Sequence, residues 1–588
     1  MSTAIGALTP NLKVEGSPLA ANLLGELVSA RVERGLGLVG RATLRFSDAG
    51  YSLSASDTFA LGKQVSISVP DSGELLSGTV TGVNLEQSSN AHPELVVVID
   101  DDAYKLTRGS QAIAYLNRSY TNVIEQIAGR HGLTAAIDAT TDVHDYLLQA
   151  GSDIEFLNAV VERTGLCWYV DGQKLVVTKV EVGTPDVTLE LGTALTEFSV
   201  RASGLRPTAL TVSGWDPAQQ TRVVGNAQQP ATAPQTPAFL ADYVGAKPGG
   251  SLPAAESAIA EFPTNQGEAN ATATSLYGDW AAGAIVARGT SVVSSRIKPG
   301  ATVGVENAGP ASGNYLVSEV DHLYNRNGFF SRFTSGPRRP AGLVDTLGAQ
   351  PPSPGFTIPG LTVALVTAND DPDGEGRVKV KYASVDDQVE SPWARVVSLG
   401  AGAGRGVVFQ PEVNDEVLVG FEHGDSRRPV VIGGLFSKAN TLPTADKLVA
   451  NGAIDYRRIT SRKNHIVELA DGGGPTEQHI LLKLGTAEHK LRLGADRFDI
   501  EVASGKEVTI KAGQAKFDIN SSGDVTIEGN NVTIKAKLAV KVEAGSQATL
   551  KGAQTAVQGT QVQVKADGVG SVEAGGPLTL KGAMVGIN

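Results

Sequence analysis

The C-terminal part of the chain repeats a short pattern of hydrophobic and polar positions. From Val508 to Ala548, pairs of apolar residues separated by one polar residue recur every seven to nine residues. Gly, Asn, Ala or Ser fills most of the intervals. This repeat is too short for helical units and is typical of short strands joined by tight corners, as in a β-helix. The positions expected to face the core are Val508, Ile510, Phe517, Ile519, Val525, Ile527, Val532, Ile534, Val540, Val542, Val562, Val564, Leu578 and Leu580.

One narrow repeat of this kind does not enclose a core, because one face of each strand is left unmatched. Three identical chains wound about a common axis would close a dry core and remove free strand edges. We therefore predict a trimeric β-helix needle over residues 508–588, with Val, Ile and Leu inside and charged residues facing water. The alternative is a single-chain solenoid with rungs of about 20 residues or more.

The N-terminal region predicts a β-barrel or sandwich with a few helices. Between residues 12 and 108, short alternating or β-branched runs are separated by Gly, Asp, Ser or Pro. Apolar spacing predicts helices over Thr121–His131, Asp153–Gly165 and Gln266–Ala282. These helices are too few for a bundle, so we expect them to decorate a mainly β region spanning residues 1–345.

The rest of the chain divides at a Pro- and Gly-rich run, which predicts a linker over residues 346–359. Residues 360–440 contain about five short strands, a size and strand number that suit a Greek-key barrel of the OB type. Residues 441–507 are expected to form a connector and the start of the needle.

Composition and charge exclude several classes of function. The 588 residues carry a net charge of -12, which argues against a nucleic-acid partner. The single cysteine, Cys167, excludes a disulfide framework and a multi-thiolate zinc site. The N-terminus shows no signal peptide, and no run approaches the ~18 apolar residues of a membrane span, so we expect synthesis in the cytoplasm.

Three segments look like ligand-binding motifs, and each has a simpler interpretation. The glycines at 35–40 match a dinucleotide fingerprint, but an alternating strand follows where a helix is required, so a hairpin loop is expected. The glycines at 400–406 lack the Lys-Ser/Thr of a phosphate cradle and predict an OB loop. Residues 369–374 resemble the start of an EF-hand loop, but Val380 replaces the bidentate Glu, so an acidic turn is expected.

Catalytic motifs are also missing. The chain contains no HExxH, GxSxG or GxxxxGK[ST], and Cys167 lies in an apolar strand where a buried thiol is expected. We therefore predict no catalytic site, no cofactor and no metal site.

Residues 371–436 resemble the OB-fold domain of VgrG proteins and phage baseplate spike proteins, through DPDGEGRVKVKY, SPWARV and GAGAGRGVVFQPEVNDEVLVGFEHGDSRRPVVIGGLF. Stretches such as LLSGTVTGVNLEQ, DAYKLTRG and LLQAGSDIEFLNAVVERTGLCWYVDGQKLVV resemble the N-terminal hub domain of that family, also seen in phage late-control proteins. The positions that carry the OB resemblance are Asp371, Gly376, Arg377, Val378, Trp393, Arg395, Pro411, Asp415, Glu416, Val417, Gly424, Asp425, Pro429 and Gly433.

The resemblance implies a non-enzymatic trimeric hub and spike of a contractile injection system. The implied fold is mainly β, with β-barrel hub domains and a few helices, an OB-fold neck and a trimeric β-helix needle. The implied partners are two further copies of the chain, a tail tube protein, baseplate proteins, a PAAR-like tip protein, effector cargo and, on sheath contraction, the target envelope. The implied location is the baseplate of a phage-tail-like particle, released or retained.

The end of the needle is the predicted binding site for the tip protein. The simpler interpretation is that the β-helix stops at its last rung and binds no tip protein. No His follows His489, so a histidine-ringed iron site is not expected there. The residues concerned are Met584, Val585, Ile587 and Asn588.

Three alternatives remain open at this point. The first alternative is a VgrG spike of a type VI secretion system. Against it, the compact needle and the absence of an effector extension favour an extracellular or phage-tail-like injection system. A trimeric glycan-binding adhesin or tail-spike predicts an exposed aromatic strip, whereas the needle region contains only Phe517. The third alternative is an envelope hydrolase, which would degrade peptidoglycan when incubated with it.

Overall fold

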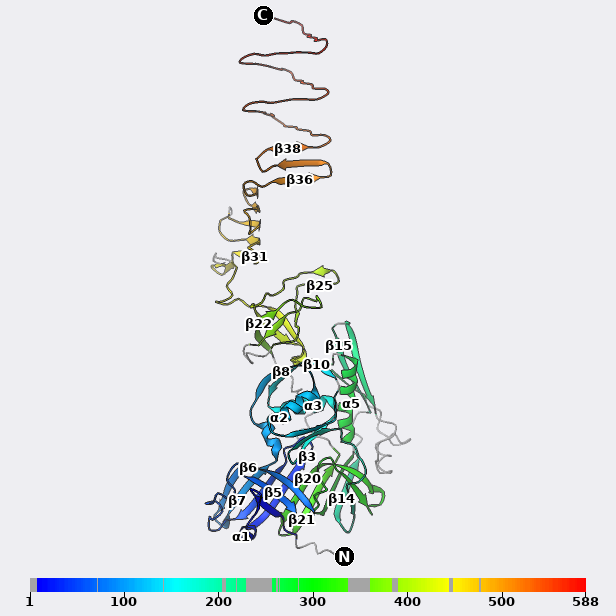
Figure 1. Cartoon of the computed structure of the whole chain (residues 1–588). Helices are drawn as coiled ribbons and strands as arrows, with labels where there is room; N and C mark the ends of the chain where they lie inside the picture. The colour runs from blue at the N-terminus through cyan, green and yellow to red at the C-terminus, as the bar shows by residue number, and fades with distance from the viewer. Residues whose placement is uncertain are drawn as a thin grey trace. The chain divides into compact units, whose positions relative to one another are not determined.

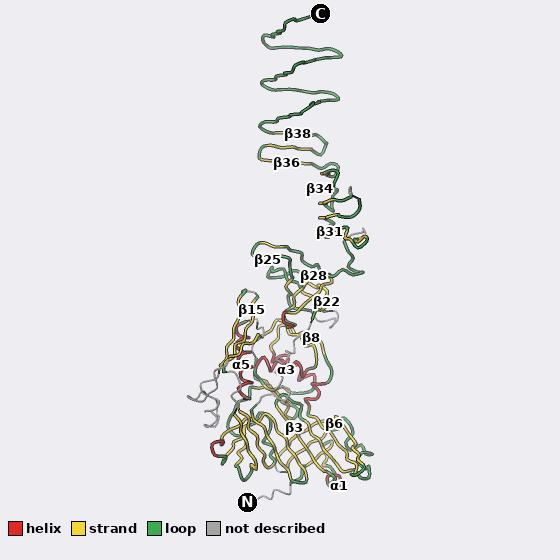
Figure 2. The backbone as a smooth tube through the Cα atoms, turned by 180° about the vertical axis from the view of Figure 1, so that it is seen from behind, coloured by secondary structure: helices red, strands yellow, loops and turns green. Residues whose placement is uncertain are grey.

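The computed structural model contains two compact units, Met1–Leu442 and Pro443–Asn588, which we describe separately. Both are mainly β, as the sequence pattern predicted (Figures 1 and 2). The predicted linker, residues 346–359, lies outside the described residues, and the predicted domain boundaries remain predictions. The described residues are 8–70, 72–140, 142–202, 208–217, 219–228, 256–260, 263, 265–283, 285–336, 360–382, 390–443, 448–474 and 477–587.

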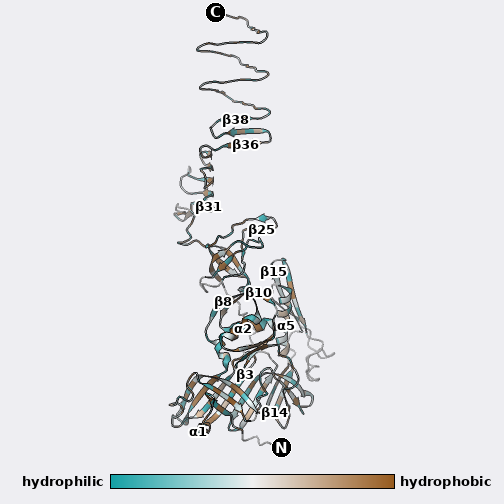
Figure 3. Cartoon of the chain, viewed as in Figure 1, coloured by the Kyte–Doolittle hydropathy of each residue, from teal (hydrophilic) through white to brown (hydrophobic). Residues whose placement is uncertain are grey.

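A 13-stranded sheet forms the base of the first unit, and its hydrophobic residues are visible along the strands in Figure 3. Its main path is β14-β18-β21-β20-β3-β4-β7-β6-β5-β1-β2, with β19 pairing β20 and β13 beside it. Alternation along β4 buries Ala42, Leu44 and Phe46. The strands are β1 (Asn11–Val14), β2 (Ser17–Pro18), β3 (Leu27–Gly35), β4 (Arg41–Ser47), β5 (Gln64–Val69), β6 (Gly73–Ser88), β7 (Ala91–Asp100), β13 (Val187–Glu190), β14 (Leu195–Ala202), β18 (Ile285–Val292), β19 (Thr302–Glu306), β20 (Gly313–Asn325) and β21 (Gly328–Ser335).

The sheet carries two hydrophobic cores. One is built from β1 and β3 to β7, and the other from β13, β14 and β18 to β21. The antiparallel pairing of β3 with β20 joins the two groups of strands. The glycines at 35–40 form the loop between β3 and β4, which confirms the predicted hairpin.

The helices lie close to their predicted positions. Helix α2 is Tyr120–Arg130 and α3 is Asp153–Thr164, where Ser152 and Glu155 form a capping box. They pack with Trp168 into a third core, together with β8 (Gln111–Ser119), β9 (Thr134–Ile137), β11 (Cys167–Asp171) and β12 (Lys174–Thr178). The short helices are α1 (Ala21–Leu24), η1 (Asp102–Thr107) and η2 (Gly309–Ala311).

Helix α5 (Gln266–Ala282) has the predicted bounds and packs against a small sheet of β15 (Ala209–Asp216), β16 (Thr221–Gln228) and β17 (Glu256–Ala260). Cys167 is buried, as its apolar surroundings predicted.

The OB region contains a five-stranded sheet in the order β23-β22-β27-β28-β24. Tyr146 and Leu148, from β10 (Val143–Gly151) of the N-terminal region, belong to its hydrophobic core. The predicted loop at 400–406 contains a short hairpin. The elements are β22 (Leu361–Ala368), β23 (Lys379–Lys381), β24 (Arg395–Val396), β25 (Ala401–Gly402), β26 (Arg405–Gly406), β27 (Glu416–Phe421), η3 (Glu422–Gly424) and β28 (Pro429–Gly434).

The second unit contains two antiparallel meanders. The first, which we call the connector sheet, has five strands in chain order, β31 (Tyr456–Thr460), β32 (Ile466–Ala470), β33 (His479–Lys483), β34 (Lys490–Gly494) and β35 (Phe498–Glu501). The second has three, β36 (Val508–Ala512), β37 (Ala515–Ile519) and β38 (Val525–Glu528). A two-stranded hairpin, β29 (Val449–Ala450) and β30 (Ala453–Ile454), precedes them.

Strand structure was predicted for the whole needle region, but residues 529–587 contain no assigned strand in the single chain. The backbone of this tract reverses direction repeatedly in successive loops (Figure 1). Strands need hydrogen-bonding partners along their edges, and a lone chain provides none for this tract. Among the described residues, no helix is long and apolar enough to cross a membrane.

Candidate interaction surfaces

The acidic turn before β23 is held by one carboxylate. Asp371 accepts hydrogen bonds from the backbone N–H groups of Asp373, Glu375 and Arg377, and from the Arg377 guanidinium at 2.7 Å. The Arg377 hydrogen bond lowers the pKa of Asp371 well below its usual range, with the backbone donors adding to the effect. The segment that resembled a calcium loop therefore closes on an arginine of its own chain.

The Asp371 carboxylate should make the stability of the OB region pH-dependent. Because its pKa is lowered by folding, its contribution is present above the unfolded value near ~3.9 and is lost as the pH falls below that value. We expect Asp371→Asn to cost about 1–3 kcal/mol at pH 7. The difference between variant and wild type should shrink at pH 3, measured by urea unfolding of the full chain. A difference that stays the same at pH 3 would contradict this role of the carboxylate.

The turn between β27 and β28 carries a buried ion cluster that joins the OB region to α3 and α5. The Arg427 guanidinium lies 2.8 Å from both the Asp425 and Glu268 carboxylates. Arg163 of α3 lies 3.5 Å from Glu268 and 3.9 Å from Asp425. Burial alone would raise the pKa of Asp425, but the charges and hydrogen bonds of Arg427 outweigh it and lower the pKa to about 2. We call these four residues the neck ion cluster.

The other residues of the OB resemblance shape the barrel. Val378 and Val417 are fully buried in its core, and Gly376 and Gly424 have φ values of 73° and 77°, in the left-handed region that favours glycine. The Lys379 ammonium lies 5.5 Å from the centre of the Trp393 ring. Of the remaining positions, Pro411 and Asp415 precede β27, and the others lie on β24, β27 and β28, namely Arg395, Glu416, Pro429 and Gly433.

The strand register gathers the first six predicted needle residues on one face. Residues paired across neighbouring strands point to the same side of a sheet. The other face is polar, with Thr509, Asp518 and Thr526 in one row. The apolar rows are Val508, Ile519 and Val525, and Ile510, Phe517 and Ile527.

Among the described residues, this apolar face is only partly covered. Ile510, Val525 and Ile527 are each 58–59% exposed. Exposed apolar patches of this extent are typical of interfaces. The later predicted core residues are likewise exposed, namely Val532, Ile534, Val540, Val542, Val562, Val564, Leu578 and Leu580.

Three of the four predicted tip residues are described, and all three are exposed: Met584, Val585 and Ile587. Asn588 lies outside the described residues. The structure does not bring them together with another described element, so tip binding remains a prediction.

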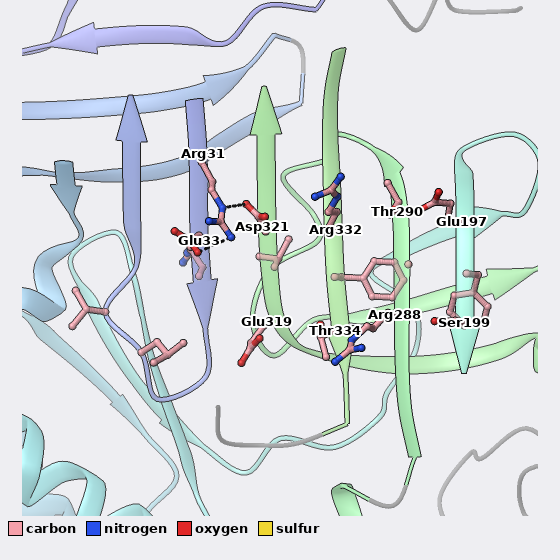
Figure 4. Close-up of a pocket in the computed structure, with 17 residues that line it drawn as sticks. Arg31, Glu33, Glu197, Ser199, Arg288, Thr290, Glu319, Asp321, Arg332 and Thr334 are labelled. Carbon is pink, nitrogen blue, oxygen red and sulfur yellow. Dashed lines mark hydrogen bonds and ion pairs between the residues drawn. The ribbon is translucent and has the colours of Figure 1, made fainter. Parts of the chain in front are cut away.

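An open groove of about 690 Å³ crosses the large sheet over β3, β20, β21, β18 and β14 (Figure 4). Arg31 bridges Asp321 at 3.1 Å and Glu33 at 2.9 Å, and Thr290 donates to Glu197 at 3.2 Å. Four arginines and four acidic residues line the groove, so its formal charges balance. Within the described ranges, no group of three or more His, Cys, Asp or Glu side chains is placed to hold a metal ion.

Two features escaped prediction from the sequence. Glu268 and Arg163 lie far from the OB motif in the chain, and only the folded structure brings them to Arg427. Strands β34 and β35 of the connector sheet alternate apolar and polar residues, but no strand was predicted there.

Two sequence families match the chain. The Type VI secretion system/phage-baseplate injector OB domain matches residues 362–436, which confirms the predicted OB region. The Alg8 N-terminal domain matches residues 5–325, more than half of the chain.

The chain also resembles two curated spike proteins. Type VI secretion system spike protein VgrG5 of Pseudomonas aeruginosa is 30% identical over 164 residues, covering 24% of this chain and 20% of that protein. VgrG3 of Vibrio cholerae is 36% identical over 77 residues, covering 12% of this chain and 8% of that protein. The matches thus span at most a fifth of the length of these relatives.

Two solved structures are similar to the chain at low sequence identity. An Escherichia coli component of the type VI secretion system is 17% identical and covers 72% of this chain and 99% of its own, with a TM-score of 0.46. A chain of the Francisella PdpA-VgrG complex is 9% identical and covers 89% and 80%, with a TM-score of 0.49. Both scores lie below 0.5, so the assignment rests on the sequence matches. The chain belongs to the Alg8 N-terminal domain family, which matches more than half of its length, and its OB domain resembles that of VgrG and phage-baseplate spike proteins.

Proposed function

We propose that this protein is the non-enzymatic, trimeric hub and spike of a contractile injection machine. The N-terminal region and the OB region form the hub and neck, which join a tail tube to the baseplate. Residues 508–588 form the needle, which is driven into a target envelope when a sheath contracts. The chain is made in the cytoplasm and assembled into a phage-tail-like particle.

The observation that carries this proposal is the apolar face of β36, β37 and β38. Six predicted core residues lie in register on that face, and three of them, Ile510, Val525 and Ile527, are exposed in the single chain. Burial of apolar surface is worth about 25 cal/mol per Å², so two further copies wound around the same axis would stabilise the needle strongly. The two spike proteins among the sequence relatives support the same role.

The proposed partners follow from this role. They are two further copies of the chain, the tube and baseplate proteins, a PAAR-like protein at the tip and effector cargo.

Light scattering coupled to size exclusion tests the proposal. We expect a mass of about three times 60.9 kDa that persists in mild denaturant. A stable monomer would contradict the needle and reopen the solenoid interpretation. Clearance of purified peptidoglycan by the chain would contradict the non-enzymatic role.

A further inference from the structure

Two histidines occupy equivalent positions at one end of the connector sheet. His465 directly precedes β32 and His489 directly precedes β34, and each closes a turn between two antiparallel strands. Alternate connections of an antiparallel meander lie at the same end of the sheet. Three segments therefore meet at this end, and we call residues 461–465, 484–489 and 502–507 the first, second and third turn.

Each histidine accepts a hydrogen bond from the backbone of the next turn. The Gly485 N–H of the second turn donates to His465 Nδ1 at 3.1 Å. The Ala503 N–H of the third turn donates to His489 Nδ1 at 3.0 Å. A backbone N–H only donates, so neither Nδ1 carries a proton. Both rings are therefore neutral, with their single proton on Nε2.

The first two turns are in close contact at Gly485. A Cβ atom at this position would lie 2.1 Å from the Lys463 carbonyl oxygen and 2.3 Å from the backbone of Asn464. Glycine allows the two backbones to approach this closely, and the approach brings the Gly485 N–H within reach of the His465 ring. The hydrogen bond is thus part of a specific fit between the two turns.

The third histidine of the sheet, His479, has the opposite requirement. Its Nδ1 lies 2.6 Å from the Glu477 carbonyl oxygen, and its Nε2 lies 3.2 Å from a carboxylate oxygen of Glu468. Both partners are acceptors, so both ring nitrogens are satisfied only when each carries a proton. Protonation therefore completes the contacts of His479, whereas it removes the acceptor atoms of His465 and His489.

The charged groups around the three turns do not compensate a proton on either neutral ring. Among the described residues, only His479 of these three histidines forms an ion pair with a carboxylate. Lys490 and Glu501 already pair with each other at 2.9 Å. The turns and the adjoining strand ends carry five cations and three carboxylates, namely Arg462, Lys463, Lys483, Lys490 and Lys506, and Glu488, Glu501 and Glu507.

We propose that His465 and His489 form an acid-sensitive latch, which holds the three turns together while both rings are neutral and releases them when the rings are protonated. Histidine is the side chain that ordinarily changes its charge between pH 5 and 8, so mild acidification opens the latch. The folded turns favour the neutral rings, so the turns lose stability as the pH falls.

The release is local and directional. The other end of the sheet, where His479 pairs with Glu468, stays closed in acid. The third turn leads directly into β36, so acid frees the start of the needle region from the connector sheet. The latch lies within one chain, and it therefore stands or falls independently of the proposed trimer.

Hydrogen–deuterium exchange of the full chain tests the latch. Protection is measured by mass spectrometry at about pH 8 and about pH 5 and is corrected for the intrinsic effect of pH on exchange. We expect peptides that contain Gly485 and Ala503 to lose protection about 2- to 10-fold at the lower pH, because each loses one hydrogen bond. Peptides within residues 466–483 should keep their protection. Equal loss over the whole sheet, or no loss at Gly485 and Ala503, overturns the latch.

Asparagine variants separate the latch from other effects of acid. The side-chain oxygen of Asn accepts a hydrogen bond but does not titrate, so in the double variant His465→Asn, His489→Asn the protection of the two amides should no longer depend on pH. The matched control, His479→Asn, should keep the wild-type loss at Gly485 and Ala503. If the double variant still loses protection in acid, another group responds to pH and the latch is wrong.

Discussion

Replacement of Arg427 by Met should destabilise the first unit by about 3–5 kcal/mol, because it leaves one buried and one partly buried carboxylate without their main counter-charge. Arg427 contacts Asp425 within the OB turn and Glu268 on α5, so both sides of the neck lose an ion pair. The measurement is the urea midpoint of the full chain at pH 7. We expect the OB region to unfold first in the variant.

Two comparisons isolate the neck ion cluster as the cause. Arg405→Met removes an exposed arginine from the same OB region and should change stability by less than about 0.5 kcal/mol. A double-mutant cycle with Glu268→Gln should show a coupling energy, because the two side chains are in direct contact. Additive effects would mean that Arg427 stabilises the neck in some way other than through Glu268.

The second large effect is expected in the needle. Ile527→Asp would place a carboxylate in the apolar row of β38, and a threefold needle would repeat it three times around one axis. Each charge buried without a partner costs several kcal/mol, and the three also repel each other. We expect the trimer to dissociate at a much lower guanidinium concentration than wild type, followed by light scattering.

The matched control is the neighbouring residue. Thr526 lies on the polar face of the same strand, so Thr526→Asp should leave the dissociation midpoint nearly unchanged. If both variants behaved alike, the apolar rows would not face a common axis.

Local patterns were sufficient to predict most elements of the first unit. The capping box at Ser152 and the left-handed Gly165, with φ of 71°, determine the ends of α3 through residues next to each other in the chain. For the same reason the alternation of apolar and polar residues over Glu416–Phe421 is enough to form β27. The single sheet that joins β3 to β20 is a contact across almost three hundred residues, which no local pattern encodes.

One candidate site could be predicted from local sequence patterns and the other could not. The apolar rows of β36 to β38 follow from a period of two, and the sequence alone indicated them. The neck ion cluster could not be predicted from the sequence, because a charged residue on a helix, such as Glu268, is usually solvated. Only the fold makes Glu268 a partner of Arg427.

The shared core between the N-terminal region and the OB region limits how this family can be recombined. Tyr146 and Leu148 pack among OB core residues such as Val380, so the OB sequence and β10 must change together. A chimaera that exchanges the OB region alone would inherit mismatched side chains in a fully packed interior. A graft joined after Leu442, where the first compact unit ends, would leave that interior intact. Natural or engineered exchange of needles should therefore be tolerated there more readily than exchange of necks.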